Sequence, residues 1–183
     1  MKLFIKKKNS EYLMYSLTIA LGILLDRISK LLAVEFLKKI DTLPLIENVF
    51  HFTYVENRGA AFGMMSDQRW LFIVASTVAI IGFSLYLYLG HADSSLFGFA
   101  IALVISGGIG NMIDRLSLGY VVDFIHCKFV KYPVFSDFGI VWREFPVFNI
   151  ADSFVCVGAG LLIFVLIREF IKESKNAKKS GSK

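Results

Sequence analysis

The chain has 183 residues, of which 56% are hydrophobic and 19% charged. A soluble domain of this length has fewer apolar and more charged residues, so the composition indicates a membrane protein. The formal net charge is +5, and lysines and arginines gather at both ends of the chain. Apolar runs separate these basic ends, which argues against a nucleic-acid partner. Because basic residues flank membrane spans on the cytoplasmic side, we expect both termini to be cytoplasmic.

Four apolar runs predict four membrane-spanning helices. The expected spans are about 12–34, 70–89, 96–115 and 150–168. The first run is similar to a secretory signal, but no small-residue cleavage site follows it, so we expect an uncleaved span. The outer segments would be about 35–69 and 117–148, and the cytoplasmic tail, partly disordered, about 169–183. The fold class expected is an all-α membrane protein, with residues 1–183 in a single integral membrane domain.

The first outer segment contains a predicted strand. Residues 48–55 are rich in aromatic and β-branched residues, and we expect them to pair with residues 43–46 in a small sheet. The loop 57–63 that follows contains two glycines, and it either lies on the membrane surface or forms a simple turn.

Glycines recur along the third and fourth spans. They are Gly98, Gly107, Gly108, Gly110, Gly158 and Gly160. Small residues allow membrane helices to approach closely, so these glycines predict tight helix packing. In the third span they would alternatively let a substrate backbone approach.

Seven polar residues fall near the outer ends of the expected spans. They are Asp26, Asn57, Asn111, Arg115, Asp123, Asn149 and Asp152. Because an ionisable group near lipid is costly, such residues are candidates for function. Asp26 and Lys30 are four apart on one helix face, so they can form an ion pair that either stabilises the interface or supports a catalytic region. Asp114 is ambiguous beside Arg115, since only one of two neighbouring helix positions needs to face inward.

Asp123 and Asp152 suit the chemistry of a paired-acid hydrolase. Two carboxylates in one site share a proton, so one can take a proton from water while the other protonates the cleaved amide. Singly, Asp123 is also explained as a solvated loop acid, and Asp152 as a helix N-terminal acid favoured by the helix dipole. No His-Glu-x-x-His or Gly-x-Ser-x-Gly motif is present, so zinc and serine peptidases are not indicated. We expect no metal and no cofactor.

Five motifs, in order along nearly the whole chain, resemble those of bacterial lipoprotein signal peptidase, also called signal peptidase II. They are Asp-Arg-Ile-Ser-Lys at 26–30, Asn-Arg-Gly-Ala-Ala-Phe-Gly at 57–63, Gly-Asn-Met-Ile-Asp-Arg at 110–115, Val-Val-Asp-Phe at 121–124 and Phe-Asn-Ile-Ala-Asp-Ser at 148–153. One motif alone would be weak, but five in sequence with a matching topology are specific.

The resemblance implies a membrane aspartyl endopeptidase of the bacterial cytoplasmic (inner) membrane. Its substrates would be diacylglyceryl-modified prolipoproteins, from which it would cleave the signal peptide just before the lipidated cysteine. The implied fold is a four-helix membrane bundle with a small extracytoplasmic β-cradle and a surface helix, with the active site at the outer leaflet. The implied enzyme acts as a monomer among membrane lipids, without nucleic acid, and is inhibited by globomycin-like cyclic peptides.

The resemblance also implies a role for each matching residue. Asp123 and Asp152 would be the catalytic dyad, acting with a water. Substrate-binding residues would be Asn57, Asn111, Arg115 and Asn149, the last also supporting the site; Asp26, Lys30 and Gly107 would be structural support. The segment 126–144 is longer than the usual pattern and is interpreted as an insertion near the substrate cleft.

A small proton-coupled transporter is the alternative function. A transporter of this kind would place its acids deep within the spans and show an internal repeat. Here the acids gather at one end and no repeat is visible.

Overall fold

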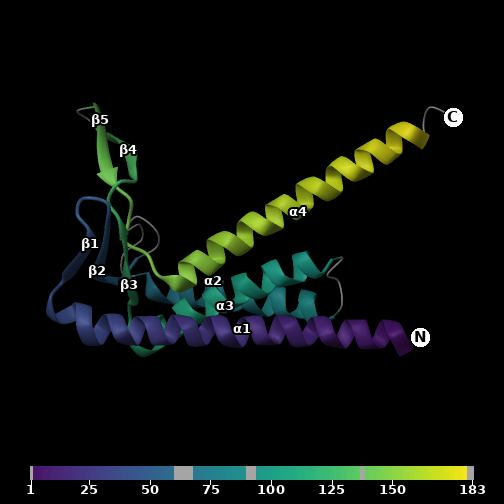
Figure 1. Ribbon diagram of the computed structural model, residues 1–183, viewed down its shortest axis with the longest axis horizontal. Coiled ribbons are helices and arrows are strands. Elements are labelled where there is room, and N and C mark those ends of the chain that lie inside the picture. Colours follow the sequence, from purple (N-terminus) through teal and green to yellow (C-terminus); the bar gives the residue numbers. More distant parts are fainter. Residues whose placement is uncertain (1, 60–67, 90–93, 137–138, 181–183) are drawn as a thin grey trace.

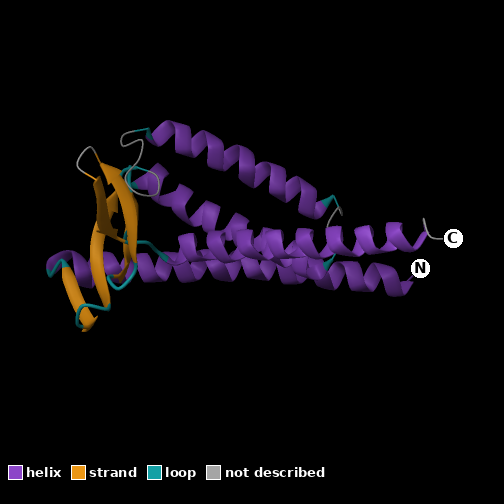
Figure 2. Ribbon diagram, turned by 90° about the horizontal axis from the view of Figure 1, so that it is seen from above, coloured by secondary structure: helices purple, strands orange, loops and turns teal. Residues whose placement is uncertain are grey.

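The computed structural model describes residues 2–59, 68–89, 94–136 and 139–180. The helices are α1 (Lys2–Phe36), the short 3-10 helix η1 (Leu37–Lys39), α2 (Arg69–Tyr88), α3 (Ser95–Ser117) and α4 (Ile150–Ser180). The strands are β1 (Thr42–Ile46), β2 (Phe50–Asn57), β3 (Val121–Cys127), β4 (Lys131–Ser136) and β5 (Gly139–Glu144). The helices extend from the strands at one end toward both termini at the other, and α4 slants away from α1 along the way (Figures 1 and 2).

Three described helices, α2, α3 and α4, are long and apolar enough to cross a membrane. They correspond to the second, third and fourth expected spans. The fold is mostly helical, as expected, with strands at one end. The first expected span lies within α1, whose outer half contains Asp26, Arg27 and Lys30 among its apolar residues. The membrane crossing of α1, and with it the count of four spans, stays a proposal.

Helix α3 is the centre of the bundle. It packs against α1, α2 and α4, and half of its apolar window is buried, against 11% for α2 and 17% for α4. The outer helices turn large apolar side chains such as Trp70 and Phe164 away from the protein. This is the surface expected of helices that face lipid.

Glycines allow α3 to contact its neighbours closely. A Cβ on Gly107 would lie under 3.0 Å from the Ala151 carbonyl oxygen and from Val155, and one on Gly158 would lie 2.7 Å from the Ala100 carbonyl oxygen. Tight helix packing is therefore confirmed at these two positions. It is wrong for Gly160, whose Cβ would meet nothing within 4 Å.

Strands β1, β2 and β3 form an antiparallel sheet in that order. The expected pairing is confirmed: Leu43 lies opposite Phe52, although β2 begins two residues later than predicted. Strand β3 was not predicted, because apolar and polar residues do not alternate along Val121–Cys127. Val122 and Phe124 on β3 are buried against the outer end of α1. The sheet is therefore fixed to the bundle through the strand that contains Asp123.

The expected insertion, 126–144, folds into part of β3 and a separate two-stranded hairpin, β4–β5. Its base is closed by a hydrogen bond from the Phe145 amide to the Val130 carbonyl, 2.8 Å. The chain then returns along β3, where Phe148 and Ile125 exchange two backbone hydrogen bonds of 2.7 and 3.0 Å. The hairpin thus lies between the two candidate acids in the chain, and its connection ends at the N-terminus of α4.

Two further expectations concern the C-terminal tail and the loop after β2. The tail 169–183 was predicted to be partly disordered, but α4 continues to Ser180. No glycine or proline occurs between Leu161 and Ser180 to end the helix. The loop 57–63, for which a membrane-surface position was one interpretation, falls mostly on residues 60–67, which lie outside the described residues.

Substitution of Gly158 by alanine should destabilise the bundle. The new methyl group meets backbone, which has little freedom to move, so we expect a loss of about 1–3 kcal/mol. Gly160→Ala is the matched control, because its methyl group enters open space and alanine is the better helix former. Thermal unfolding in detergent would measure both, and equal melting temperatures would contradict the packing argument.

Candidate active site

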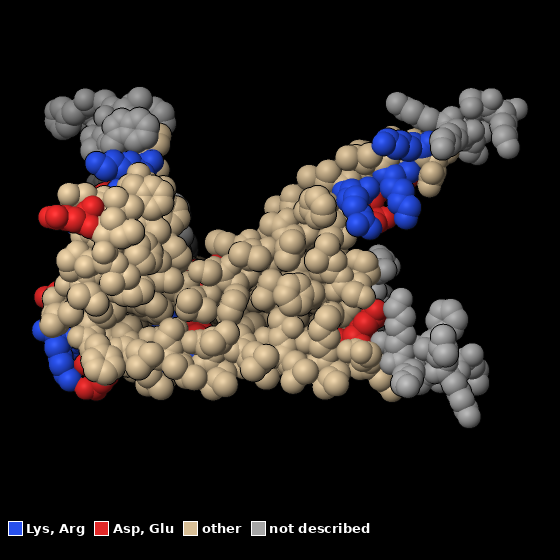
Figure 3. Space-filling view, viewed as in Figure 1, with Lys and Arg blue, Asp and Glu red and all other residues tan. Residues whose placement is uncertain are grey.

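Asp123 on β3 and Asp152 in the first turn of α4 line one cavity. Its volume is about 1430 Å³, and Asn57, Asn111 and Arg115 line it as well. The surface is hollowed between the strands and α4, the two parts that contribute most of the lining (Figure 3). The fold thus places the two acids and three of the four expected substrate-binding residues around a single space.

Asp123 is almost fully buried, with 1% of its surface exposed. Its Oδ2 accepts a hydrogen bond from Asn57 Nδ2 (2.9 Å) and its Oδ1 accepts one from Asn149 Nδ2 (2.6 Å). Burial, and next the charge of Asp152, raise the pKa of Asp123 to about 7, while the two amide hydrogen bonds oppose the shift. Near neutral pH, Asp123 therefore holds a proton in a large share of the molecules.

Asp152 is fixed by the start of its own helix. The Asp152 amide donates to Asn149 Oδ1 (2.9 Å), and the Asn149 amide donates back to Asp152 Oδ2 (3.2 Å). This is the reciprocal arrangement of a capping box, with aspartate in the place of glutamate. The other oxygen, Oδ1, accepts from Asn111 Nδ2 (2.7 Å). Asp152 therefore caps the N-terminus of α4 and also lies in the cavity that it shares with Asp123.

Asn149 forms hydrogen bonds to both candidate acids. It has no exposed surface and is not among the residues that line the cavity. Besides Asp123, its Nδ2 lies 3.1 Å from Asn111 Oδ1 and 3.3 Å from the Val122 carbonyl oxygen. Its position therefore favours the supporting role over direct contact with substrate.

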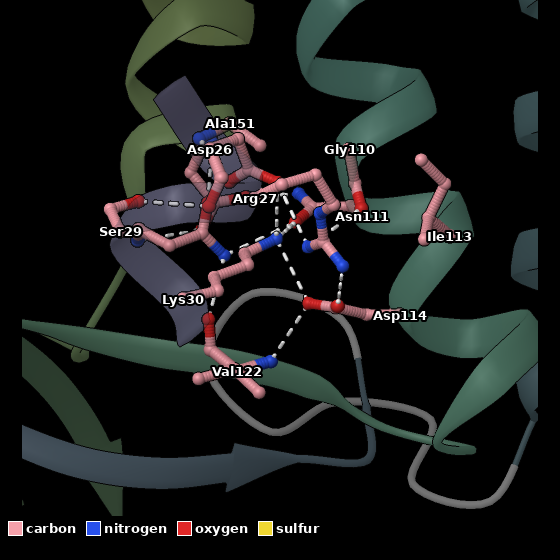
Figure 4. Close-up of polar contacts among 12 residues, drawn as sticks. Asp26, Arg27, Ser29, Lys30, Gly110, Asn111, Ile113, Asp114, Val122 and Ala151 are labelled. Carbon is pink, nitrogen blue, oxygen red and sulfur yellow. Dashed lines mark hydrogen bonds and ion pairs between the residues drawn. The ribbon is translucent and has the colours of Figure 1, made fainter. Parts of the chain in front are cut away.

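A buried ion cluster lies next to this site and consists of Asp26, Arg27, Lys30 and Asp114 (Figure 4). Lys30 Nζ contacts Asp26 Oδ2 (3.1 Å), Asp114 Oδ2 (2.9 Å) and Asn111 Oδ1 (2.8 Å). Because the ammonium holds the Asn111 carbonyl oxygen, the amide group of that side chain must face Asp152. Lys30 thus determines which end of Asn111 meets the acid.

The same cluster ties the secondary-structure elements together. The Val122 amide, next to Asp123 in the chain, donates to Asp114 Oδ2 (3.1 Å). The Ala151 amide, next to Asp152, donates to Asp26 Oδ1 (3.2 Å). The carboxylates of Asp26 and Asp114 therefore hold the backbone beside each candidate acid.

Arg27 and Asp114 were not among the predicted site residues. Arg27 Nη1 lies 2.7 Å from Asp114 Oδ1, and Arg27 Nη2 lies 3.0 Å from Asp26 Oδ2. The sequence did contain a signal for both, since each is a charged residue at the outer end of an apolar run. The sequence did not indicate that these two residues pair with each other, because they lie on different helices, α1 and α3.

The remaining expected residues divide between lining and packing. Arg115 Nη2 donates to the Gly59 carbonyl (3.4 Å), and its guanidinium lies 5.1 Å from the centre of the Phe72 ring. Gly107 lies outside the cavity lining, and its role is to let the first turn of α4 approach α3. Within the described residues, no group of three or more His, Cys, Asp or Glu side chains could hold a metal ion.

Comparison with known proteins identifies the family. The family model described as "Signal peptidase (SPase) II" matches residues 18–168. The chain belongs to the signal peptidase II family. As a member of this family the chain is a protease, and the expectation of a peptidase is confirmed. The residue roles implied by the resemblance stay predictions.

Its relatives match over most of their length. A lipoprotein signal peptidase of Clostridioides difficile is 46% identical over 159 residues, which covers 86% of this chain and 97% of that protein. One from Halalkalibacterium halodurans is 36% identical over 167 residues, covering 90% of this chain and all of that protein. A solved bacterial membrane enzyme superposes with a TM-score of 0.73 at 28% identity, covering 86% of this chain and 89% of that chain. This signal peptidase II family member therefore also has the fold of a membrane enzyme.

Substitution of Lys30 by methionine should strongly destabilise the protein. It would leave two buried carboxylates with Arg27 as their remaining cation in the cluster, so that one negative charge is unbalanced, and breaking a buried ion pair from one side costs about 3–5 kcal/mol. Lys39→Met is the matched control, because Lys39 pairs with Glu35 on an exposed helix surface. We expect a large drop in melting temperature for the first variant and almost none for the second; similar values would contradict the importance of the cluster.

The stability of the protein should fall as the pH rises from about 4 to about 7. The pKa of Asp123 is about 7 in the folded state and near 3.8 when unperturbed. Between these values the folded state binds more protons than the unfolded state, so raising the pH favours unfolding, by about 1.4 kcal/mol per pH unit at most. Chemical denaturation at several pH values would measure this slope. The Asp123→Asn variant should show a smaller slope, and an unchanged slope would contradict the assignment.

Proposed function

We propose that this signal peptidase II family member cleaves the signal peptide from diacylglyceryl-modified prolipoproteins just before the lipidated cysteine. The catalytic groups would be Asp123 and Asp152, acting on a water molecule. The observation that supports this most directly is that two acids from separate elements line one cavity, each oriented by asparagine side chains. The names of the relatives, lipoprotein signal peptidases, support the substrate class.

In the proposed mechanism, Asp152 is the base and Asp123 the acid. Asp123 holds a proton near neutral pH because its pKa is raised to about 7. Asp152 takes a proton from water as the water oxygen bonds to the scissile carbonyl carbon, and Asp123 gives its proton to the carbonyl oxygen. Asp152 then protonates the leaving nitrogen, the C–N bond breaks, and a hydroxyl proton of the intermediate returns to Asp123. No covalent enzyme intermediate is required.

Three lining residues would bind the precursor backbone near the acids. Asn57 and Asn111 each have one polar end turned to an acid, and Arg115 offers a planar guanidinium suited to carbonyl oxygens. The Phe72 ring lies within cation–π distance of the Arg115 guanidinium and helps to hold it in place. Asn149, Asp26, Lys30 and Gly107 would act from outside the cavity by fixing these groups.

The proposed membrane arrangement places the site at the outer leaflet of a bacterial cytoplasmic membrane. It has four spans in one integral domain, both termini cytoplasmic, and the strands outside. The gathering of both termini at the end opposite the strands supports it (Figure 1), as do the basic residues near the end of α4 (Figure 3). The enzyme would work as a monomer, and globomycin-like cyclic peptides would inhibit it by occupying the same cavity.

Replacement of either acid by asparagine should abolish cleavage without unfolding the protein. Loss of a general acid or base costs about 10²–10⁴-fold in rate, and asparagine keeps the size of the side chain. A gel-shift assay with purified protein and a diacylglyceryl-modified precursor, with and without globomycin, would measure the loss.

Asp41→Asn is the matched control, since Asp41 is exposed before β1 and away from the cavity. We expect that variant to cleave normally. Full activity in Asp123→Asn or in Asp152→Asn would rule out the proposed mechanism.

A further inference from the structure

Glu144, the last residue of β5, lies on the wall of the cavity, and nearly half of its side chain is exposed. The other carboxylate on this rim, Glu56, is already neutralised. It lies 3.0 Å from Lys38 and 3.7 Å from Arg58. Apart from the two candidate catalytic acids, the cavity is therefore lined by one carboxylate, Glu144, that forms no ion pair with a lysine or arginine of the described residues.

A chain of hydrogen bonds from the sheet fixes the position of Glu144. Thr42 Oγ1 donates to Thr53 Oγ1 (3.3 Å), and Thr53 Oγ1 lies 3.3 Å from His126 Nδ1. His126 Nε2 lies 3.2 Å from Glu144 Oε2. The neutral His126 tautomer with its N–H at Nε2 satisfies both contacts, because Nδ1 then accepts from the Thr53 hydroxyl and Nε2 donates to Glu144. His126 thereby links the sheet to the Glu144 carboxylate.

The surroundings of His126 keep it neutral. Burial lowers its pKa, and the nearby Lys128 and His51 lower it further, against the opposing effect of Glu144. At neutral pH His126 therefore orients Glu144 by a hydrogen bond and leaves its negative charge uncompensated. Lys131 lies opposite Glu144 in the hairpin register, but no ion pair within 4.0 Å joins these two described side chains.

The cavity has two sides of different character. Toward the helices it is lined by small and apolar residues of α4, including Val155, Cys156 and Val157. Toward the strands it is lined by the base of the hairpin, with Tyr132 and Glu144. An apolar signal peptide lies within the membrane and suits the first side. The rest of the precursor leaves toward the strand end, which is farthest from the termini (Figure 1), and has to pass the second side.

We propose that the Glu144 carboxylate contacts the precursor residues that follow the cleaved bond. It thereby favours precursors with a basic side chain at these positions. The proposal rests on the proposed function and adds to it a specificity residue and the charge of its ligand. Hairpin β4–β5 then serves to place one carboxylate on the exit path of the precursor, beside the segment that leads to Asp152.

The test uses the full chain, purified in detergent, and synthetic diacylglyceryl-modified precursors with one signal peptide. They differ only at the second to fourth residues after the cysteine, which are lysine, glutamine or glutamate. For the wild type we expect kcat/KM to be about fivefold higher for the lysine than for the glutamate precursor, a modest ratio because the pair is partly exposed. Glu144→Gln should bring this ratio close to one, and Glu144→Lys should reverse it.

Glu47→Gln is the matched control, because it removes an exposed carboxylate from the β1–β2 turn, outside the cavity lining. Its ratio should equal that of the wild type. His126→Gln should lower the ratio, since Glu144 loses its orienting donor.

Cleavage of the glutamine precursor and the charge ratio answer different questions. If the wild type cleaves the glutamine precursor but does not prefer lysine over glutamate, the role of Glu144 is overturned and the proposed function stands. A preference that persists in Glu144→Lys overturns it as well. If the wild type cleaves no precursor, the proposed function fails and this inference fails with it. The wild-type ratio decides the matter even when a variant does not fold.

Discussion

The arrangement of the site depends on one buried lysine. Lys30 lies between two carboxylates of different helices, Asp26 and Asp114, and gives its third contact to Asn111. A lone ammonium so deeply buried would be costly, and so would either carboxylate by itself. The four charges of the cluster balance, because Arg27 supplies the second cation. The helices can therefore approach at this depth only in the arrangement that brings all four groups together.

That requirement fixes the backbone around each candidate acid. The two carboxylates of the cluster accept hydrogen bonds from the Val122 and Ala151 amides, which are the neighbours of Asp123 and Asp152 in the chain. Asn149 then spans the distance between the acids, and the capping box at the start of α4 uses the same residues. Helix start, sheet attachment and site geometry are thus consequences of one polar network enclosed by apolar packing.

The strands position Asp123 and extend the wall of the cavity. The sheet β1–β3 brings Asp123 to the bundle, while hairpin β4–β5 extends the wall of the cavity beyond it. The first of these depends on burial of Val122 and Phe124 against α1. The second depends on backbone pairing at Val130 and Phe145 and on the contact between His126 and Glu144. The hairpin can therefore vary in this position without disturbing the contacts that orient the acids.

The sequence by itself determined whatever depends on local pattern. Apolar runs gave the helices α2, α3 and α4, because a stretch of about 20 apolar residues has few stable alternatives to a span. The spacing of Asp26 and Lys30 gave their ion pair, and five motifs gave the family. Local pattern failed for β3 and for the hairpin, where neighbouring elements decide the outcome. The length of α4 was misjudged although the sequence contains its reason, the lack of glycine and proline between Leu161 and Ser180.

Only the tertiary structure decided which groups meet. The partners of Lys30 lie on two helices, and no spacing within one helix reveals that Asp114 is among them. The placement of Asn149 below the cavity, and of Glu144 on its wall, likewise follows from contacts between segments distant in the chain. The physical reason is that a polar group buried near lipid must find its partner across space, whereas an apolar residue needs only to be on the correct face.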